Sequence, residues 1–330
     1  MKKVFLVLIV LLCCATSYAQ HLVATLEHEG NIIVFYGMDA FKQANNSAVS
    51  GDVITLSSGL FNGNAEIKKN ITLRGAGWKG DKKTEIRDNI SIKIPSSDNV
   101  SNLSFEGIQF SGEMYVDSLL HNPLISRCRL RELRFRNVFN GVFSSCYIEG
   151  VGQQYVPDTM HFQVTFSNCV LDMLGVHNMS FLNCIVGQNM SGSGHIFVNS
   201  ILVGGNDLDY SCIAVNCVSV RENNSCFSKC NGTNNVTVPS RSSIFANYPG
   251  KSEYGYFITN TDYDDADSYE LLPAAQTQYI GNDGTQVGVY GGDQPFSYIP
   301  SYPCINNMQV SNKSNDEGKI NVKVEVTPAQ

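Results

Sequence analysis

The middle of the chain repeats a short pattern of apolar and polar positions. Within each repeat apolar residues alternate with polar ones, which predicts a short β-strand, and Gly, Asn and Ser separate the repeats. Two neighbouring columns of the alignment are nearly uniform, the first holding Asn168, Asn183, Asn199 and Asn216 and the second holding Cys146, Cys169, Cys184, Ser200 and Cys217. The segments that align without gaps are 142–150, 164–172, 179–187, 195–204 and 212–220.

The period of this repeat selects the fold. Successive residues of the cysteine column are 23, 15, 16 and 17 positions apart, whereas helix-pair repeats need roughly 34 to 45 residues. Short β-rich units of this size fit the coils of a solenoid, each of which adds ~4.8 Å along the axis. We therefore expect an all-β fold, a single-stranded right-handed parallel β-helix of about ten coils. Small, apolar cysteines suit its interior column. Asparagines suit a left-handed turn, where their amides can bond along the ladder.

The segments on either side of the repeat predict its boundaries. We expect a signal peptide over 1–19, an N-terminal strand and capping helix over 20–50, coils over 51–245 and irregular final coils over 246–304. A C-terminal strand segment over 305–330 completes the chain. Within it, residues 319–326 alternate apolar and polar positions, so we expect one amphipathic strand that lies along the solenoid or closes its far end.

The first 19 residues have the features of an export signal. Lys2 and Lys3 precede the apolar run from Val4 to Cys14, and Ser17 and Ala19 supply the small residues of a cleavage site. The run is too short to span a bilayer of roughly 30 Å. We expect an exported protein that is periplasmic, on the outer surface or secreted, with no transmembrane segment in the mature chain.

Composition excludes several other classes of protein. The 330 residues carry 23 basic and 30 acidic side chains, a formal charge of −7, which argues against general nucleic-acid binding. Charged residues make up only 16%, too few for a disordered polyelectrolyte or a coiled coil. Nine of the 11 cysteines lie after the signal, so an odd number remains. Cys226 and Cys230 lie in an expected loop, and a local disulfide between them fits an exported protein.

Three stretches of the chain resemble a known superfamily. The chain is similar to the right-handed parallel β-helix proteins of the pectin-lyase-like superfamily, and especially to a group of secreted Gram-negative bacterial members. The stretches are the helix-like segment 37–48 with 51–61 after it, the Asn-Cys repeat, and the exit formed by 269–271 and 281–296. Gln286 stands where members commonly have Asp. The resemblance implies a helix that caps the first coil. It does not fix an activity, because the superfamily contains lyases, hydrolases and proteins without known chemistry.

A row of arginines is the most unusual chemical feature. If Cys128 and Leu130 point inward, the arginines around them point outward on one face of a strand. Such a row could bind carboxylated or sulfated glycan, since guanidinium groups pair bidentately with these groups. The alternative is a surface charge ladder with Glu106, Glu113 and Glu149 on adjacent coils. The arginines are Arg127, Arg129, Arg131, Arg134 and Arg136.

Catalysis is the alternative to binding. A polysaccharide lyase or glycoside hydrolase would act on uronate-containing polysaccharide, and a hydrolase needs two carboxyl groups across the scissile bond. Asp172, Asp207 and Asp209 are the candidates, and their other interpretation is that they cap turns. We expect a non-catalytic protein that binds glycan or another surface polymer along its solenoid.

No cofactor is expected from the sequence. His161, His177 and His195 lack the ligand spacing of a zinc site. An acidic cluster could ligate Ca²⁺ but lacks the Gly and Glu of an EF-hand, so a solvated turn is the preferred interpretation. Its residues are Asp262, Asp264, Asp265 and Asp267.

Overall fold

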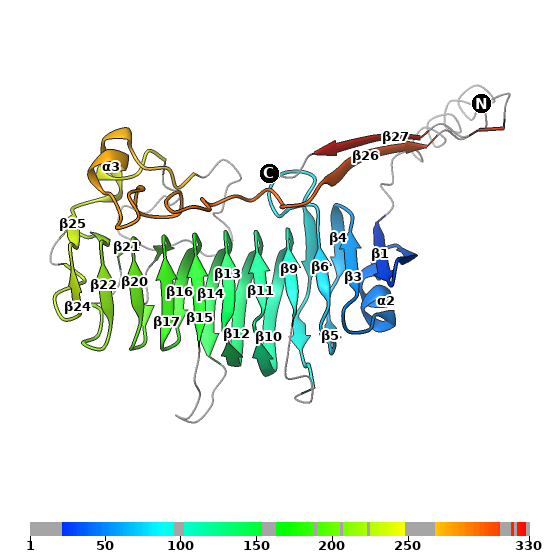
Figure 1. The fold of residues 1–330 in the computed structure, drawn as a ribbon, viewed down its shortest axis with the longest axis horizontal. Helices are drawn as coiled ribbons and strands as arrows, with labels where there is room; N and C mark the ends of the chain where they lie inside the picture. Colours follow the sequence, from blue (N-terminus) through cyan, green and yellow to red (C-terminus); the bar gives the residue numbers. More distant parts are fainter. Residues whose placement is uncertain are drawn as a thin grey trace, which may run out of the picture.

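The protein is a parallel β-helix, as the repeat predicts, with a separate C-terminal hairpin (Figure 1). The computed structural model describes residues 22–95, 102–153, 163–187, 190–204, 207–222, 225–247, 268–310, 318–319 and 322–327. The expected signal peptide, 1–19, and the acidic cluster at Asp262, Asp264, Asp265 and Asp267 lie outside these residues. None of the described helices is long and apolar enough to span a bilayer.

Two long sheets form the walls of the solenoid. Ten of the 12 strands in the first sheet are parallel, one for each coil, in agreement with the expected number. These ten are β3 (Val53–Leu56), β6 (Thr72–Arg74), β9 (Ser104–Glu106), β11 (Leu124–Ser126), β13 (Gly141–Ser144), β15 (Val164–Ser167), β17 (Met179–Leu182), β20 (Ile196–Val198), β22 (Ile213–Val215) and β24 (Asn231–Thr233).

The second sheet follows the first after a one-residue turn in each coil of the repeat. Its strands are parallel as well, and β10 and β12 are long enough to bend around a corner of the coil. They are β4 (Gly59–Asn62), β7 (Thr84–Arg87), β10 (Gln109–His121), β12 (Arg129–Phe139), β14 (Tyr147–Gln153), β16 (Val170–Gly175), β18 (Ile185–Val186), β21 (Ile201–Val203), β23 (Val218–Val220) and β25 (Val236–Val238), joined by β5 (Ala65–Ile67), β8 (Ile90–Ile92) and β19 (Met190–Ser191).

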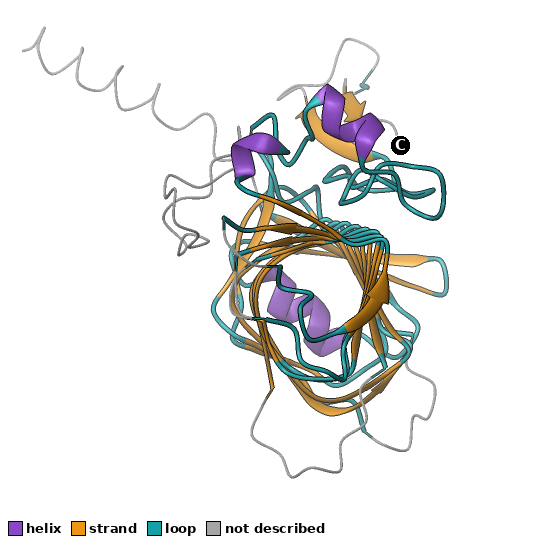
Figure 2. Ribbon diagram, turned by 90° about the vertical axis from the view of Figure 1, so that its left-hand side faces the viewer, coloured by secondary structure: helices purple, strands orange, loops and turns teal. Residues whose placement is uncertain are grey.

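A helix and a hairpin close the N-terminal end. Strands β1 (Val23–His28) and β2 (Asn31–Tyr36) pair antiparallel, and β1 also pairs with β3. Helix α2 (Ala40–Ser47) buries Phe41 and Ala44 against the first coil. Figure 2 looks along the solenoid from its other end and shows α2 across the far opening. This confirms the capping helix expected near residues 37–48.

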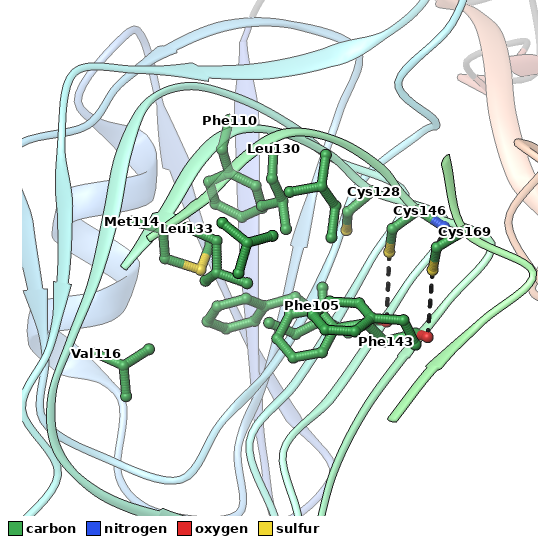
Figure 3. Close-up of a cluster of buried hydrophobic side chains, with 14 of the residues drawn as sticks. Phe105, Phe110, Met114, Val116, Cys128, Leu130, Leu133, Phe143, Cys146 and Cys169 are labelled. Atoms are coloured by element: carbon green, nitrogen blue, oxygen red, sulfur yellow. Dashed lines mark hydrogen bonds between the residues drawn. The ribbon is translucent and has the colours of Figure 1, made fainter. Parts of the chain in front are cut away.

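Like residues stack on like through the interior. Phe143, Phe166, Phe181 and Phe197 are direct partners in the register of the first sheet. Their ring centroids follow one another at 5.1, 5.3 and 4.8 Å. All four side chains are buried, and the contacts form one continuous core that also contains the cysteine column (Figure 3).

The cysteine column is buried in one line, as the repeat predicts. The thiols of Cys146, Cys169 and Cys184 each lie against two backbone carbonyl groups, one from the same coil and one from the coil before. For Cys169 these are the carbonyl oxygens of Ser167 and Phe143, both at 3.3 Å, and Figure 3 draws the bond to Phe143. Its sulfur also accepts a hydrogen bond from the backbone N–H of Cys146 at 3.4 Å. The thiols therefore bond backbone groups beside the turn, and the eight cysteines whose side chains are described form no disulfide with one another.

The residue before each cysteine makes the turn between the two sheets. Asn168, Asn183, Asn199 and Asn216 have φ between 51 and 52°, the left-handed region that asparagine tolerates best after glycine. Ser145 takes the same place at φ 51° in an earlier coil. The turn column predicted from the sequence is confirmed.

The asparagine amides bond a distant segment instead of one another. After α3 (Pro273–Gln278), residues 281–302 run back along the turn column from late coils to early ones (Figure 1). We call residues 268–302 the C-terminal strap. Asn168 Nδ2 donates to the carbonyl oxygens of Val289 and Gly291, at 2.9 and 2.7 Å. The expectation that these amides form a ladder among themselves is wrong for Asn168, Asn183 and Asn199, because the strap takes up their hydrogen bonds.

Close approach explains the glycines of the strap. A Cβ atom on Gly281 would lie 2.6 Å from the Asn199 side chain, and one on Gly288 would lie 2.7 Å from Ile201. Gly288 and Gly292 also have φ of +83° and +76°. The glycine-rich exit of the sequence therefore encodes docking of the strap on the solenoid.

The C-terminal strand forms a hairpin with the strand before it. β27 (Val322–Thr327) pairs antiparallel with β26 (Cys304–Val310) in a separate two-stranded sheet. Figure 1 places this hairpin above the N-terminal coils, so β27 does not close the far end of the solenoid. A short 3-10 helix (Arg241–Ser243) follows the last coil instead.

We predict that the Asn199 amide stabilises the docked strap. Asn199→Gly keeps the left-handed turn but removes hydrogen bonds to Asn282 and Asp283, at 2.9 and 3.0 Å. The substitution also removes the hydrogen bond that Asn199 accepts from the Asn282 N–H. Because each lost bond costs about 1 kcal/mol, the free energy of unfolding measured in urea titrations should fall by roughly 2 to 3 kcal/mol. The matched control is Asn216→Gly, with the same turn geometry and no strap hydrogen bond among the described residues. Equal losses in both variants would contradict the role of the amide.

A second prediction concerns the buried imidazole of His195. Its side chain is 1% exposed between Phe181 and Phe197, and burial lowers its pKa from 6.5 to about 4. Between these values the unfolded chain binds a proton that the folded chain does not, so stability falls as pH drops below 6.5. Between pH 7 and pH 4.5, the free energy of unfolding of the wild-type protein should fall by roughly 2 to 3 kcal/mol more than that of His195→Met. Denaturant titrations at both pH values measure this, and parallel losses would refute it.

Candidate functional site

The arginine row does not lie on one strand. Arg127 has φ 48° and makes the left-handed turn that asparagine makes in later coils. Its Nη1 lies 2.9 Å from Glu106 Oε1, and Glu106 also accepts hydrogen bonds from the N–H and the hydroxyl of Ser301 in the strap. The expectation that Arg127 shares an outward face with Arg129 and Arg131 is therefore wrong, because the turn separates it from β12.

Arg129 is held between an acid and an aromatic ring. Its Nε and Nη2 donate to Glu149 Oε1 on the next coil at 3.1 and 2.8 Å, and the guanidinium lies 5.6 Å from the centre of the Tyr147 ring. The two charged side chains are only 12% and 15% exposed. Burial raises the pKa of Glu149, and the positive charges of Arg129 and Arg131 oppose that rise. Arg129 therefore acts as a structural cation.

The exposed part of the row lies further along β10 and β12. Glu113 and Glu132 are direct partners on these strands, and like charges in that position repel. Arg134 Nε lies 3.3 Å from Glu113 Oε2 and 3.2 Å from Glu132 Oε1, so it balances both. Tyr115 donates its hydroxyl to Glu113, which raises the pKa of the phenol. We call Glu113, Tyr115, Arg131, Glu132 and Arg134 the charged band.

Three of the five arginines that were expected to bind glycan form ion pairs within the protein. Arg127, Arg129 and Arg134 pair with glutamates of their own or adjacent coils, which is the charge ladder that the sequence offered as the alternative. Arg131 is exposed. The side chain of Arg136 lies outside the described residues. The charged band thus combines donors and acceptors in a nearly neutral surface.

A glycine strip continues the charged band along the solenoid. In register, Tyr115 pairs with Arg134, Arg134 with Gly152, Gly152 with Gly175, and Gly175 with Ser191. Large side chains thus give way to glycine at the same position of the next two coils. A Cβ atom on Gly152 would lie 3.3 Å from Glu132 Oε1, so glycine leaves room for that carboxylate. Glycines of this kind mark places where another molecule can approach the backbone closely.

The aspartates proposed from sequence have structural roles where they are described. Arg221 Nη1 donates to Asp207 Oδ1 at 2.8 Å, and this bond lowers the pKa of Asp207. Asp209 accepts hydrogen bonds from the N–H and hydroxyl of Ser211, at 2.9 and 2.7 Å, and caps a turn. The side chain of Asp172 lies outside the described residues.

Histidines and acids do not form a metal centre in the described part of the chain, where groups of three or more ligating side chains are lacking. His195 lies in the interior, and His177 bonds Ser193 at the surface. His161 is not among the described residues.

Comparison with known proteins adds no assignment. No protein-family model matches the chain, and a search of curated proteins finds no match.

We predict that Arg129 contributes more to the stability of the fold than Arg134 does. Arg129→Met removes the guanidinium that bonds the mostly buried Glu149 and should cost about 3 kcal/mol. Arg134→Met removes two ion pairs of an arginine that is 40% exposed and should cost about 1 kcal/mol or less. Guanidinium unfolding curves compare the two, with Arg129→Met plus Glu149→Gln expected to recover most of the loss. An equal cost for both single variants would contradict the structural role of Arg129.

Proposed function

We propose that the protein is an exported, non-catalytic β-helix of the pectin-lyase-like kind that binds an acidic polysaccharide across the charged band. The observation that supports this most is the combination of prearranged donors and acceptors with the adjoining glycine strip. Sugar hydroxyl groups both donate and accept hydrogen bonds, so they match a surface that alternates arginine, carboxylate and phenol.

Charge suggests how the glycan contacts are divided. Arg131 and Arg134 supply cations for carboxylate or sulfate groups, while Glu113, Glu132 and Tyr115 bond hydroxyls. Because the side chains already hold one another in place, less conformational entropy is lost on binding than for free arginines. Each exposed contact contributes on the order of 0.2 to 1 kcal/mol, so affinity requires several residues of one glycan chain.

A glycoside hydrolase at the same surface is the second candidate. Glu113 and Glu132 both lie near Arg134 Nε, at 3.3 and 3.2 Å, so their nearest oxygens are at most 6.5 Å apart. This upper bound overlaps the range of catalytic carboxyl pairs, about 5 to 9.5 Å. Both carboxylates, however, pair with the arginine between them, whereas a hydrolase needs one carboxyl group that donates a proton to the leaving oxygen. This arrangement favours binding over catalysis.

The test is binding to a panel of neutral and uronate-containing polysaccharides at low and high salt. Wild-type protein should retain acidic glycan at low salt, and binding should weaken as salt rises. Arg131→Ala with Arg134→Ala should weaken it about tenfold, the loss of two contacts of roughly 0.7 kcal/mol each. The control is Lys42→Ala with Lys68→Ala, which removes the same charge from the N-terminal coils.

Three outcomes are informative. Equal loss in the two double variants would mean that net charge, not the charged band, controls binding. Equal retention of neutral and acidic glycans would contradict the assignment of the arginines. Release of reducing ends or unsaturated products, lost in Glu113→Gln or Glu132→Gln, would replace the binding proposal with the enzymatic one.

A further inference from the structure

The last two coils bring two cysteines into direct register. Ile213 pairs with Asn231 and Ala214 with Gly232 in the parallel ladder of β22 and β24. One residue earlier on each strand, Cys212 therefore lies opposite Cys230. The N–H of Asn231 donates to the carbonyl oxygen of Cys212 at 3.1 Å, so the ladder continues to this pair.

Both side chains belong to the interior. Cys212 is fully buried, two residues before the buried Ala214 and hence on the same face of its strand. Cys230 is half-buried and packs against the same core cluster. Paired parallel strands lie about 4.8 Å apart, within the 4.4–6.8 Å range over which Cα atoms of a disulfide are found.

A crosslink between Cys212 and Cys230 would stabilise the terminal coil of the solenoid. All three residues of β24 are exposed, and β24 is the last strand of the first sheet. Among the described residues no helix covers this end as α2 covers the other. A terminal coil that stacks on one neighbour only is the least stabilised part of a solenoid.

We propose that Cys212 and Cys230 form a disulfide that fastens the last coil to the one before it. The oxidant is a small-molecule disulfide. The Cys230 thiolate, at the more exposed position, attacks one sulfur of glutathione disulfide and releases one glutathione. The Cys212 thiolate then attacks the Cys230 sulfur of the mixed disulfide and releases the second. Two protein thiols are oxidised, one glutathione disulfide is reduced to two thiols, and the two protons pass to the released glutathiones.

The neighbouring cysteines have other partners. Cys217 lies in the turn column, where its thiol contacts the carbonyl oxygen of Val215 at 3.3 Å. Cys226 lies beside Ser219, whose hydroxyl accepts its backbone N–H at 3.4 Å. We propose the pairing across coils in place of the pairing of Cys226 with Cys230 that their sequence spacing suggests.

The experiment is disulfide mapping on the full chain. Protein is incubated with glutathione disulfide at pH 8.5, because burial raises the pKa of the Cys230 thiol and slows exchange at neutral pH. Free thiols are then alkylated and the chain is cut after Lys and Arg and before Asp. Cleavage after Lys229 separates Cys226 from Cys230. All variants carry Cys217→Ser, which leaves Cys212 as the one cysteine in peptide 209–221. Serine is tolerated in the cysteine column, because Ser200 is buried there.

The expected product is peptide 209–221 linked to peptide 230–241. Oxidation should raise the melting temperature by on the order of 5 °C, since the bond closes a loop of about 20 residues. Cys230→Ser should abolish this rise, and the control Cys226→Ser should keep it. A link that contains peptide 222–229, or complete alkylation of Cys212 and Cys230 after oxidation, would overturn the proposal.

Discussion

The structure depends on one backbone constraint, the left-handed turn that each coil of the repeat makes between its two sheets. A single residue with φ near 50° makes this turn, which is why asparagine recurs there. Because the turn always falls at the same place in the coil, the side chains of these residues form a line along the solenoid. The residue after each turn points inward, and this sets the cysteine column and, through it, the register of the phenylalanines.

The same line of turns determines where the strap lies. Asn168 and Asn199 donate side-chain hydrogen bonds to strap residues more than 80 positions away in sequence. In earlier coils Ser145 and Glu106 accept hydrogen bonds from the strap residues Ser297 and Ser301. Asparagine therefore has two roles at once, since it permits the turn and presents an amide to the covering segment.

The strap in turn divides the outer face of the second sheet into two regions. In later coils the residue after the cysteine column is apolar and is buried with Val287 and Val289 of the strap. These residues are Val170, Ile185, Ile201 and Val218. Arg129 occupies this position in an earlier coil, and Tyr147 lies at the boundary between the two regions. The charged band lies further along the long strands, outside this apolar contact. The division between covered and exposed surface thus explains where polar chemistry is available.

Resemblance to a known superfamily predicted the capping role of the helix. Local pattern alone predicted the coils, the helix itself and both columns, because stacking repeats the same environment in each coil. It misplaced Arg127, since alternation of polar and apolar residues was extended through a turn. Cys128 lies 18 residues before Cys146 and extends the cysteine column by one coil, so the residue before Cys128 takes the place of the turn. The side-chain contacts between the strap and the solenoid could not be predicted in this way, since they join residues 83 to 227 positions apart and leave only glycines as a local trace. The two glutamates that pair with Arg134 could not be predicted either, because shifts in the register between β10 and β12 decide which residues lie side by side.

Amide hydrogen exchange across the strap tests this account most directly. The N–H groups of Val287, Gly288 and Phe296 donate to the carbonyl oxygens of Tyr279, Asn199 and Val289 at 2.8 to 3.0 Å. If the turn column holds the strap, these amides exchange slowly, with protection similar to that of strands β15 and β17. Exchange of residues 281–302 within seconds, at the rate of an unstructured peptide, while the solenoid strands stay protected, would show that the strap is not bound to the turn column.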